Sequence, residues 1–177
     1  MESNTKLEID KKFYLKTLQT FDVTNSYVQW LNDYEVTKYT EQKNFNHTID
    51  SVNEFVDEKY NSSTDQLFGI FYENIHIGNI KLGPIQWQHK AAEISYFIGN
   101  KDFWGKGIAS KCINAVLEYA TINLSLEKIN AGYYDLNIGS AKVLKKCGFI
   151  IEGERVNDLI FEGKRINLIL VGYCTKV

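Results

Sequence analysis

Two glycines between a predicted strand and a predicted helix have the spacing of a phosphate-binding loop. They stand in the run Trp104-Gly105-Lys106-Gly107-Ile108-Ala109-Ser110. The first turn of a helix exposes N–H groups at the positive end of its dipole, and glycines let a ligand approach the backbone closely. Lys106 adds a positive charge, and the small Ala109 and Ser110 keep the approach open. Because a short glycine pair fits a structural turn equally well, its neighbours must decide the interpretation.

The same spacing argues against two common nucleotide-binding motifs. A Walker loop ends in Gly-Lys followed by Ser or Thr, whereas Gly105-Lys106 is followed by Gly107. A dinucleotide fingerprint needs a third glycine and a ribose-binding acid further along, and neither follows at the right distance. The loop therefore gives no support to either nucleotide fold.

Hydrophobic periodicity predicts the elements that must position this loop. Predicted strands cover residues 9–15, 67–72, 76–82, 91–98, 128–133, 150–156 and 165–173. Predicted helices cover residues 22–32, 48–61 with Thr48 as N-cap, 108–124, and 140–147 closed by Gly148. The resulting order is β-α-α-β-β-β-α-β-α-β-β, with an antiparallel meander in the middle of the chain.

Length and composition predict one compact domain. The 177 residues are 44% hydrophobic and 14% aromatic, which suffices for one sizeable core, and the single proline leaves no obvious linker. We therefore expect residues 1–177 to form a single domain. With a net charge of −2, nucleic acid is not expected as a partner. The N-terminus lacks a signal-peptide pattern and no segment reaches membrane-spanning length, so we expect a cytoplasmic protein without a membrane partner.

The cysteines give no sign of a metal site. Cys112, Cys147 and Cys174 are widely spaced and lack the pairing of a zinc site or a disulfide framework. We expect reduced, mostly buried thiols and no metal.

In this context the glycine loop resembles motif A of the GNAT superfamily, Gln/Arg-x-x-Gly-x-Gly/Ala, which wraps the coenzyme A pyrophosphate at the start of the central helix. Gly107 and Ala109 match its last two positions, whereas Trp104 replaces the usual Gln or Arg. Phe-Trp-Gly-Lys-Gly-Ile-Ala is similar to the variant typical of the ribosomal-protein-alanine acetyltransferase (RimJ/RimL-like) branch. A second signature, Asn137-Ile138-Gly139-Ser140 followed by Lys146-Cys147-Gly148-Phe149, is similar to elements of the family's fourth helix.

The resemblance implies a fold and a co-substrate. The GNAT fold is α/β (α+β), with a mostly antiparallel mixed sheet of about seven strands flanked by about four helices. The sheet is splayed between strands 4 and 5, which here are residues 93–98 and 128–133. Acetyl-CoA enters this opening as co-substrate. The implied cofactor-binding residues are Phe97, Ile98 and Gly99 on the strand, Gly105, Lys106, Gly107, Ile108, Ala109 and Ser110 in the loop, and Asn137.

Amine acetylation needs a proton acceptor and a polarised thioester carbonyl. Glu93 lies on the fourth strand, where similar enzymes often carry a carboxylate, and we take it as the general base, with Asp158 and Glu162 as rivals and a surface role as the alternative. Many members place a tyrosine seven residues after the asparagine to protonate the leaving thiolate, and Leu144 occupies that position. Ser140 or a neighbouring water is the candidate acid, unless Ser140 only bonds helix backbone or cofactor.

The acceptor would be bound by the first two helices and nearby loops, as in similar enzymes. Glu41 is expected to attract the amine, His47 to contact a hydroxyl and Trp87, in the loop over residues 81–89, to stack on the acceptor. The histidine as a cap and the tryptophan as a packed loop residue are the simpler alternatives. The amino-acid sequence of these segments resembles that of acetyltransferases that modify amino groups of nucleotide-linked sugars.

Several acceptors and one non-enzymatic function stay open. The amine is that of a small molecule, such as a nucleotide-linked amino sugar, or belongs to a protein N-terminus or a polyamine. A non-catalytic acyl-CoA-binding sensor would keep the glycine loop and dispense with the missing tyrosine. The sequence does not distinguish a monomer from a dimer.

Overall fold

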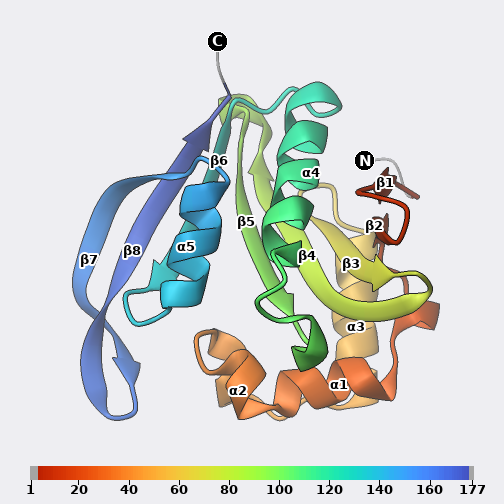
Figure 1. Cartoon of the computed structure of the whole chain (residues 1–177), viewed down its shortest axis with the longest axis horizontal. Helices are drawn as coiled ribbons and strands as arrows, with labels where there is room; N and C mark the ends of the chain where they lie inside the picture. The colour runs from red at the N-terminus through yellow and green to blue at the C-terminus, as the bar shows by residue number, and fades with distance from the viewer. Residues whose placement is uncertain (1–3, 176–177) are drawn as a thin grey trace.

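The computed structural model describes residues 4–175. The eight strands in this range form one sheet (Figure 1). The spatial order of the strands is β1-β2-β3-β4-β5-β6-β8-β7. All neighbours pair antiparallel except β5 and β6, which are parallel. The strands are β1 (Lys6–Glu8), β2 (Phe13–Thr17), β3 (Gln66–Tyr72), β4 (Ile75–Gln86), β5 (Ala91–Ile98), β6 (Lys128–Tyr134), β7 (Ile150–Phe161) and β8 (Lys164–Cys174).

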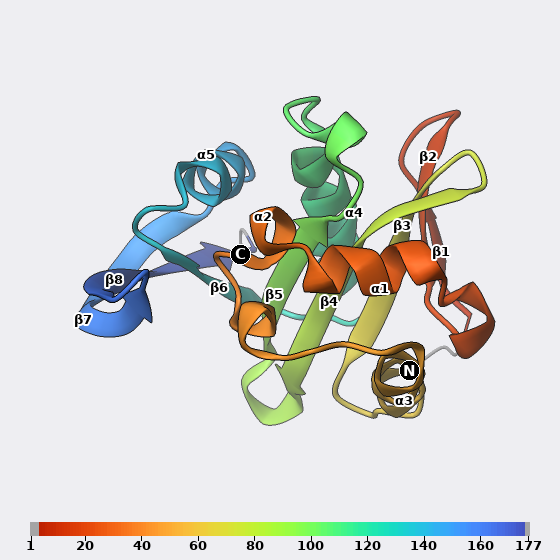
Figure 2. The same cartoon turned by 90° about the horizontal axis from the view of Figure 1, so that it is seen from below.

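Helices cover both faces of this sheet (Figure 2). Helices α4 (Ile108–Ile122) and α5 (Ile138–Lys146) lie on one face, α3 (Ile49–Tyr60) lies on the other, and α1 (Asn25–Asn32) and α2 (Tyr34–Thr37) cross one end of the strands. The larger core cluster packs α4 against the sheet through residues such as Phe68, Ile80 and Val116. A second cluster packs α1 and α3 against it through Tyr27, Val52 and Phe71. Helix α4 and helices α1 and α3 thus pack on the sheet through separate cores.

The predicted first strand over residues 9–15 is wrong in its bounds. A turn at Asp10 divides the segment, because its carboxylate accepts the backbone N–H groups of Lys12 and Phe13, both at 3.0 Å. Such a side-chain turn breaks the ladder, so β1 ends at Glu8 and β2 begins at Phe13. This extra strand accounts for eight strands where about seven were expected.

The predicted start of the second long helix is confirmed. The Thr48 side chain accepts the backbone N–H of Ser51 at 3.2 Å, and Ser51 returns a bond to the Thr48 N–H at 3.0 Å, so α3 opens with a capping box. The short α2 and the 3₁₀ turn η2 (Glu41–Asn44) were not predicted, because four residues are too few to show a hydrophobic period. They supply a fifth helix and one wall of the site.

The strands that follow are longer than their patterns predict. β4 continues to Gln86, so most of the predicted loop over residues 81–89 is strand and only η3 (Trp87–His89) is a turn. β7 and β8 extend to a tight turn at Glu162 and Gly163, both with positive φ. The additional residues of each strand lie at a β-bulge or in an exposed hairpin. There, pairing with the neighbouring strand maintains the ladder although the sequence shows no hydrophobic alternation.

The feature that positions the site is the separation of β5 from β6. Their register covers only Ala91 to Glu93 on β5, opposite Lys128 to Asn130 on β6. From Ile94 to Ile98, β5 keeps β4 as its partner while β6 pairs with β8. The splay predicted between residues 93–98 and 128–133 is therefore present, and one edge of β5 is left without a strand partner over this stretch.

Candidate active site

The glycine loop lies between the open end of β5 and the start of α4. Gly105 and Gly107 have φ values of 71° and 73°, the left-handed region that glycine adopts without strain. A Cβ added at either residue would meet no atom within 4 Å, so the space above the loop is open. Gly107 caps α4 without a side-chain bond, which leaves the N–H groups of the first turn for a ligand. This geometry suits a pyrophosphate.

Two loop side chains serve the loop itself. The Ser110 hydroxyl donates to the Gly107 carbonyl at 2.9 Å and is buried, so only its backbone N–H faces a ligand. The Trp104 indole N–H donates to the Ile98 carbonyl at 2.7 Å and ties the loop to the end of β5. In the described residues Lys106 forms no ion pair and lies 5.5 Å from the centre of the Phe103 ring. Its ammonium is free to meet an anion.

The end of β5 is already partly bonded. The Gly99 N–H donates to the Ile77 carbonyl at 2.9 Å, and a Cβ at Gly99 would overlap the Trp30 ring. Phe97 belongs to the face that packs on α1, and Ile98 carries the Trp104 bond on its carbonyl. Backbone groups that a pantetheine chain would use must therefore come from the edge of β5 that faces β6.

A cavity of about 590 Å³ opens beside this edge. Its floor is the β4–β5 surface, and its walls come from α1, η2 and its following loop, and α3. The lining residues are Tyr27, Leu31, Thr40, Gln42, Phe45, Asn46, His47, Ser51, Val52, Phe55, Leu67, Asn79, Lys81, Ser95, Tyr96 and Phe97. Apart from His47 and Lys81, they are aromatic, aliphatic or uncharged polar residues.

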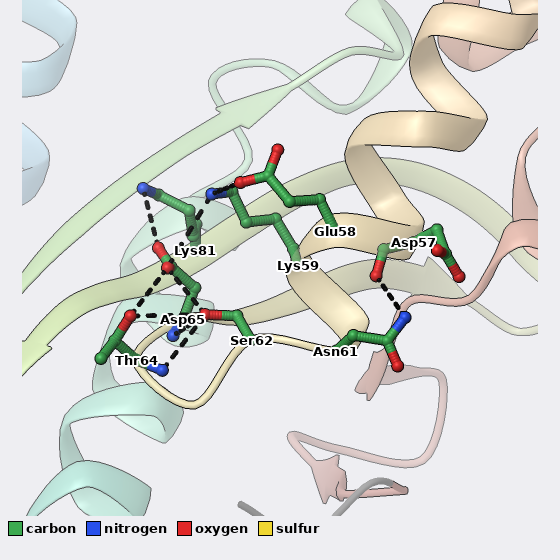
Figure 3. A network of polar contacts seen from close by, with 8 residues as sticks. All are labelled: Asp57, Glu58, Lys59, Asn61, Ser62, Thr64, Asp65 and Lys81. Atoms are coloured by element: carbon green, nitrogen blue, oxygen red, sulfur yellow. Dashed lines mark hydrogen bonds and ion pairs between the residues drawn. The ribbon is translucent and has the colours of Figure 1, made fainter.

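Lys81 is held by a polar network at the end of α3 (Figure 3). Its ammonium lies 3.4 Å from Asp65, whose other oxygen accepts from Ser62 at 3.0 Å and lies 3.8 Å from Lys59. Burial alone would raise the pKa of Asp65, but the Ser62 bond and the two lysine charges outweigh it and hold the pKa below its ordinary value. The carboxylate thus stays charged and fixes the one cation of the cavity.

Asn79 is the polar residue on the cavity floor that sequence reasoning missed. It is 3% exposed, its Oδ1 lies 2.7 Å from His76 Nε2, and its Nδ2 has no hydrogen-bond partner among the described residues. The Tyr27 hydroxyl interacts with this amide, and a bound ligand oxygen would add a hydrogen bond to Nδ2. The available signal was the run Ile77 to Leu82, where alternation places Asn79 and Lys81 together on one face.

Glu93 lies where β5 and β6 part. It shares a face of β5 with Ser95 and Phe97, which line the cavity, but it is not itself a lining residue. Its carboxylate is exposed, and within residues 4–175 no hydrogen bond or ion pair holds it.

Ser140 is joined to β5 by a hydrogen bond across the opening. Its Oγ lies 2.9 Å from the Tyr96 hydroxyl, and no helix carbonyl in the described residues accepts from it. The Ser140 N–H donates to the Asn137 side chain at 3.0 Å, so Asn137 caps α5. Burial raises the pKa of Tyr96 to about 12, opposed by the Ser140 bond. Tyr96, which also lines the cavity, was not singled out from the sequence.

The three predicted acceptor-binding residues lie in different places. His47 lines the cavity, with its Nε2 3.3 Å from the Gln42 carbonyl. Glu41 does not line it, because its carboxylate accepts from Tyr134 at 2.5 Å and from Asn44 at 3.0 Å. Trp87 is also outside the lining. It lies in η3, before the end of β5 that pairs with β6, and its indole N–H donates to the Ser63 carbonyl. The next residue after Glu41, Gln42, lines the cavity in its place.

The rival bases belong to the long hairpin. Asp158 lies 3.8 Å from Arg155 on the exposed β7, and Glu162 accepts from the Tyr34 hydroxyl at 2.9 Å. Neither lines the cavity. At position 144 the leucine is 1% exposed and belongs to the core that packs α5, so it has no access to a ligand.

Cys112 and Cys147 are buried and Cys174 is exposed. Burial raises the pKa of the Cys112 thiol to about 12 and that of Cys147 to about 11, so both stay protonated near neutral pH. Within residues 4–175, no group of three His, Cys, Asp or Glu side chains is arranged to hold a metal ion. No helix in that range is long and apolar enough to cross a membrane.

Comparison with known proteins agrees with this geometry. Residues 12–150 match the family described as an acetyltransferase (GNAT) domain. The chain is 36% identical over 99 residues to a probable N-acetyltransferase, YjcK, of Bacillus subtilis, an alignment that covers 54% of each protein. The chain therefore belongs to the GNAT acetyltransferase family, and the predicted enzyme class and fold are confirmed.

Two solved structures share the fold at low identity. The spermidine N-acetyltransferase of Vibrio cholerae, in complex with CoA and spermine, superposes with a TM-score of 0.83 at 22% identity, over 93% of this chain and 96% of that one. A ribosomal-protein-S5-alanine acetyltransferase of Vibrio fischeri does so with a TM-score of 0.83 at 22% identity, over 96% of both. One scaffold thus serves a polyamine enzyme and a ribosomal-protein enzyme, and the acceptor must be argued from this chain's own cavity.

Proposed function

We propose that this protein is a cytoplasmic, single-domain N-acetyltransferase that transfers the acetyl group of acetyl-CoA to a primary amine by direct attack within a ternary complex. One observation carries the proposal. Three residues just beyond the point at which β5 loses its partner β6, which are Ser95, Tyr96 and Phe97, line the cavity, so a cofactor in the opening and an amine in the cavity would meet near them. Acetyl-CoA supplies an acetyl group activated as a thioester.

Binding of the pyrophosphate is assigned to the loop from Gly105 to Ser110. Two glycines with open space above them, an uncapped helix start and the unpaired Lys106 form an anion cradle. The free edge of β5 near Phe97, Ile98 and Gly99 would bond the pantetheine amides as a strand partner does. Asn137 contributes by capping the helix that carries Ser140.

Glu93 is the proposed general base. An amine is protonated at neutral pH and must lose a proton before attack, and Glu93 is the exposed carboxylate on the cavity face of β5. A backbone N–H near Ile98 would polarise the thioester carbonyl. Ser140, at the start of α5, would donate to the departing sulfur.

Direct attack is favoured over an acyl-enzyme. An acyl-enzyme needs an activated nucleophile such as a thiolate, and the thiols of Cys112 and Cys147 are buried and protonated. Cys174 is exposed and near Lys128, on the far end of β8 from the hairpin turn. None of the three lines the cavity.

An amino group on a nucleotide-linked sugar is the acceptor that we propose. Aromatic rings such as Phe45 and Phe97 offer faces for a sugar ring, and Gln42 and Asn79 offer hydrogen bonds. Lys81, although its ammonium lies 3.4 Å from Asp65, is the one lysine or arginine among the lining residues that a phosphate would contact. No Asp or Glu lies among the lining residues of the described chain, whereas a polyamine calls for several carboxylates. The cavity thus disfavours the polycation that the Vibrio cholerae relative binds, and a peptide N-terminus would want a more open groove.

The test is thiol release from acetyl-CoA with a panel of amines. The panel contains nucleotide-linked 4-amino sugars, peptides with free N-termini and spermidine, and release is followed with a thiol reagent. Stimulation by the amino sugars is expected, with little or none by spermidine. Stimulation by peptides alone would move the acceptor to a protein. Tight acetyl-CoA binding with no stimulation by any amine would support a non-catalytic sensor and overturn the proposal.

A further inference from the structure

We propose that the Tyr96 hydroxyl positions Ser140 to stabilise the sulfur that leaves during acetyl transfer. This inference rests on the proposed function and adds a residue to it. Many GNAT enzymes use a tyrosine on the helix for this purpose, and here the helix position holds Leu144, which is buried in the core. The structure supplies a tyrosine from the opposite strand instead.

The location of the pair identifies the step it serves. Tyr96 belongs to β5, beyond the last residue paired with β6, and Ser140 belongs to the first turn of α5, which follows β6. Their 2.9 Å hydrogen bond spans the opening between the strands. Tyr96 also lines the acceptor cavity. The Tyr96 side chain, however, alternates with those of Ser95 and Phe97 on the cavity floor and packs with the core on the α4 side of the sheet. The pair therefore lies on the α5 side of the opening between β5 and β6, and we place the breaking bond to the sulfur there.

The chemistry of the two hydroxyls favours one direction of the bond. Either hydroxyl could donate, and because a phenol is the stronger acid we take Tyr96 as the donor and Ser140 Oγ as the acceptor. The serine then keeps its own hydrogen for another acceptor, and a hydroxyl that accepts one hydrogen bond donates a stronger one. Among the described residues the only bond to Ser140 Oγ is that with Tyr96. The serine hydrogen would thus be left for a group bound in the opening.

Burial keeps the Tyr96 phenol neutral. Burial raises the pKa of Tyr96 to about 12, and the nearby Cys147 thiol is also protonated because burial raises its pKa to about 11. Cys147 donates to the Ser110 carbonyl at 3.5 Å and is not available to Ser140. Tyr96 therefore remains a hydrogen-bond donor throughout the pH range in which a CoA thiol titrates.

The step balances without a further reactant. The amine nitrogen forms the C–N bond, the C–S bond breaks, and the sulfur leaves with the bonding electron pair while accepting the Ser140 hydrogen bond. The ammonium form of the amine loses one proton to solvent before attack, and Glu93, directly or through water, takes a second proton from the nitrogen after attack and returns it to water. The thiolate finally takes one proton from water, so the net reaction gives an N-acetyl product, free CoA and one proton released to solvent.

The experiment measures the ionisation of bound CoA, which needs no acceptor. Thiolate absorbance in the ultraviolet is followed against pH for CoA bound to the wild type, Tyr96→Phe, Ser140→Ala and the double variant, with desulfo-CoA as the blank. If the pair stabilises the thiolate, its titration midpoint rises by roughly half to one pH unit in each single variant, the effect of one net hydrogen bond. The double variant should equal Ser140→Ala, because Tyr96 acts through Ser140.

Turnover with the best amine gives the second measurement. Ser140→Ala is expected to lower kcat by roughly 100-fold and Tyr96→Phe by roughly five- to tenfold, with the KM for acetyl-CoA nearly unchanged. Tyr119→Phe is the matched control, since Tyr119 is a buried tyrosine in the α4 core whose hydroxyl forms no hydrogen bond in the described structure. It should leave both the thiol titration and kcat as in the wild type.

Two results would overturn the inference. An unchanged thiol titration in Tyr96→Phe, with thermal unfolding or KM altered instead, would make the bond a structural brace of the opening. A Ser140→Ala enzyme with wild-type kcat would remove the serine from the step. Failure of every amine to stimulate thiol release would refute the proposed function and not this pair, because the titration of bound CoA would still report on it.

Discussion

The proposed cofactor side and the proposed acceptor side of the site are built from different kinds of groups. On the cofactor side, the loop around Gly105 and Gly107 and the free edge of β5 offer backbone groups from two adjacent segments. On the acceptor side, side chains from α1, α3, η2, β4 and β5 surround a cavity of about 590 Å³. The first depends on backbone conformation and the second on which side chains five separate elements bring together.

This difference explains how one fold serves several acceptors. A pyrophosphate bound by N–H groups requires glycine at a few positions and tolerates change elsewhere. A cavity lined by side chains can be changed residue by residue without altering the sheet that supports it. Here that lining contains Lys81 and no carboxylate in the described chain, although the fold is shared with an enzyme whose structure holds spermine.

The largest effect is expected on the cofactor side. Valine at position 107 would be strained at a φ of 73° and would fill the space above the loop. With the loss of several bonds to phosphate, we expect Gly107→Val to raise the acetyl-CoA Kd by roughly 1,000-fold, measured by calorimetry. Gly163→Val is the matched control, because Gly163 has a φ of 77° and open space but lies in the β7–β8 turn. Equal losses in both would contradict a phosphate site.

The next effect is expected where the two sides meet. Glutamine in place of Glu93 keeps the size of the side chain but cannot accept a proton, so we expect kcat to fall by roughly 100-fold with little change in acetyl-CoA binding. The deficit should shrink as the pH rises toward the pKa of the acceptor amine, which then needs no base. The pH profile of kcat measures this.

The rival carboxylates provide the control for Glu93. Asp158→Asn and Glu162→Gln remove charges that pair with Arg155 and Tyr34 outside the cavity, and near-normal turnover is expected for both. Wild-type kcat in Glu93→Gln together with its loss in Asp158→Asn would transfer the base to β7.

A smaller effect is expected on the acceptor side. Lys81→Met removes the cation of the cavity while keeping the length of the side chain, and we expect the KM for a phosphate-bearing acceptor to rise roughly tenfold. The acetyl-CoA Kd should not change, because Lys81 lies on the cavity floor away from the glycine loop. Trp87→Phe, outside the cavity lining, is the control and should leave that KM within about twofold. An equal rise in both variants would place the acceptor elsewhere.

The smallest effect concerns the stability of the network that fixes Lys81. Asp65→Asn is expected to lower the free energy of unfolding by about 1–2 kcal/mol at pH 7, since it removes the partner of Lys59 and Lys81. The folded pKa of Asp65 lies below the ordinary 3.8, so its contribution is present above that value and is lost as the pH falls through the folded pKa. Urea unfolding at pH 7 and at pH 3 should show the difference between wild type and variant shrink. An undiminished difference would exclude ionisation as its cause.

The sequence predicted the fold best where local signals were strong. The strand Ala91–Ile98 has its predicted bounds, the cap at Thr48 is confirmed, and Gly148 closes α5 with a φ of 88°. It failed where local bonding overrode the pattern, as at the Asp10 turn, and where ladders between strands extended β4 and β7.

For the site, the sequence described best the parts whose conformation is local. The left-handed Gly107 before α4 is set by neighbouring residues, and Asn137, which was predicted to bind the cofactor, caps α5. Glu41 and Trp87 were expected at the acceptor, but Tyr134 and Ser63 hold them outside the cavity lining. Those contacts join residues 93 and 24 positions apart, which no short motif encodes.

The sequence by itself predicted the family, which the comparisons confirm, and the proposed acetyl-CoA site at the glycine loop, because a left-handed backbone at Gly105 and Gly107 and a helix start are local requirements on residue type. Only the tertiary structure decided that Tyr96 meets Ser140, 44 positions away, and that Asn79 and Lys81 form the floor of the cavity. The physical reason is that side-chain chemistry at the acceptor depends on which strands separate and which helices cover them, and packing across the whole sheet sets both.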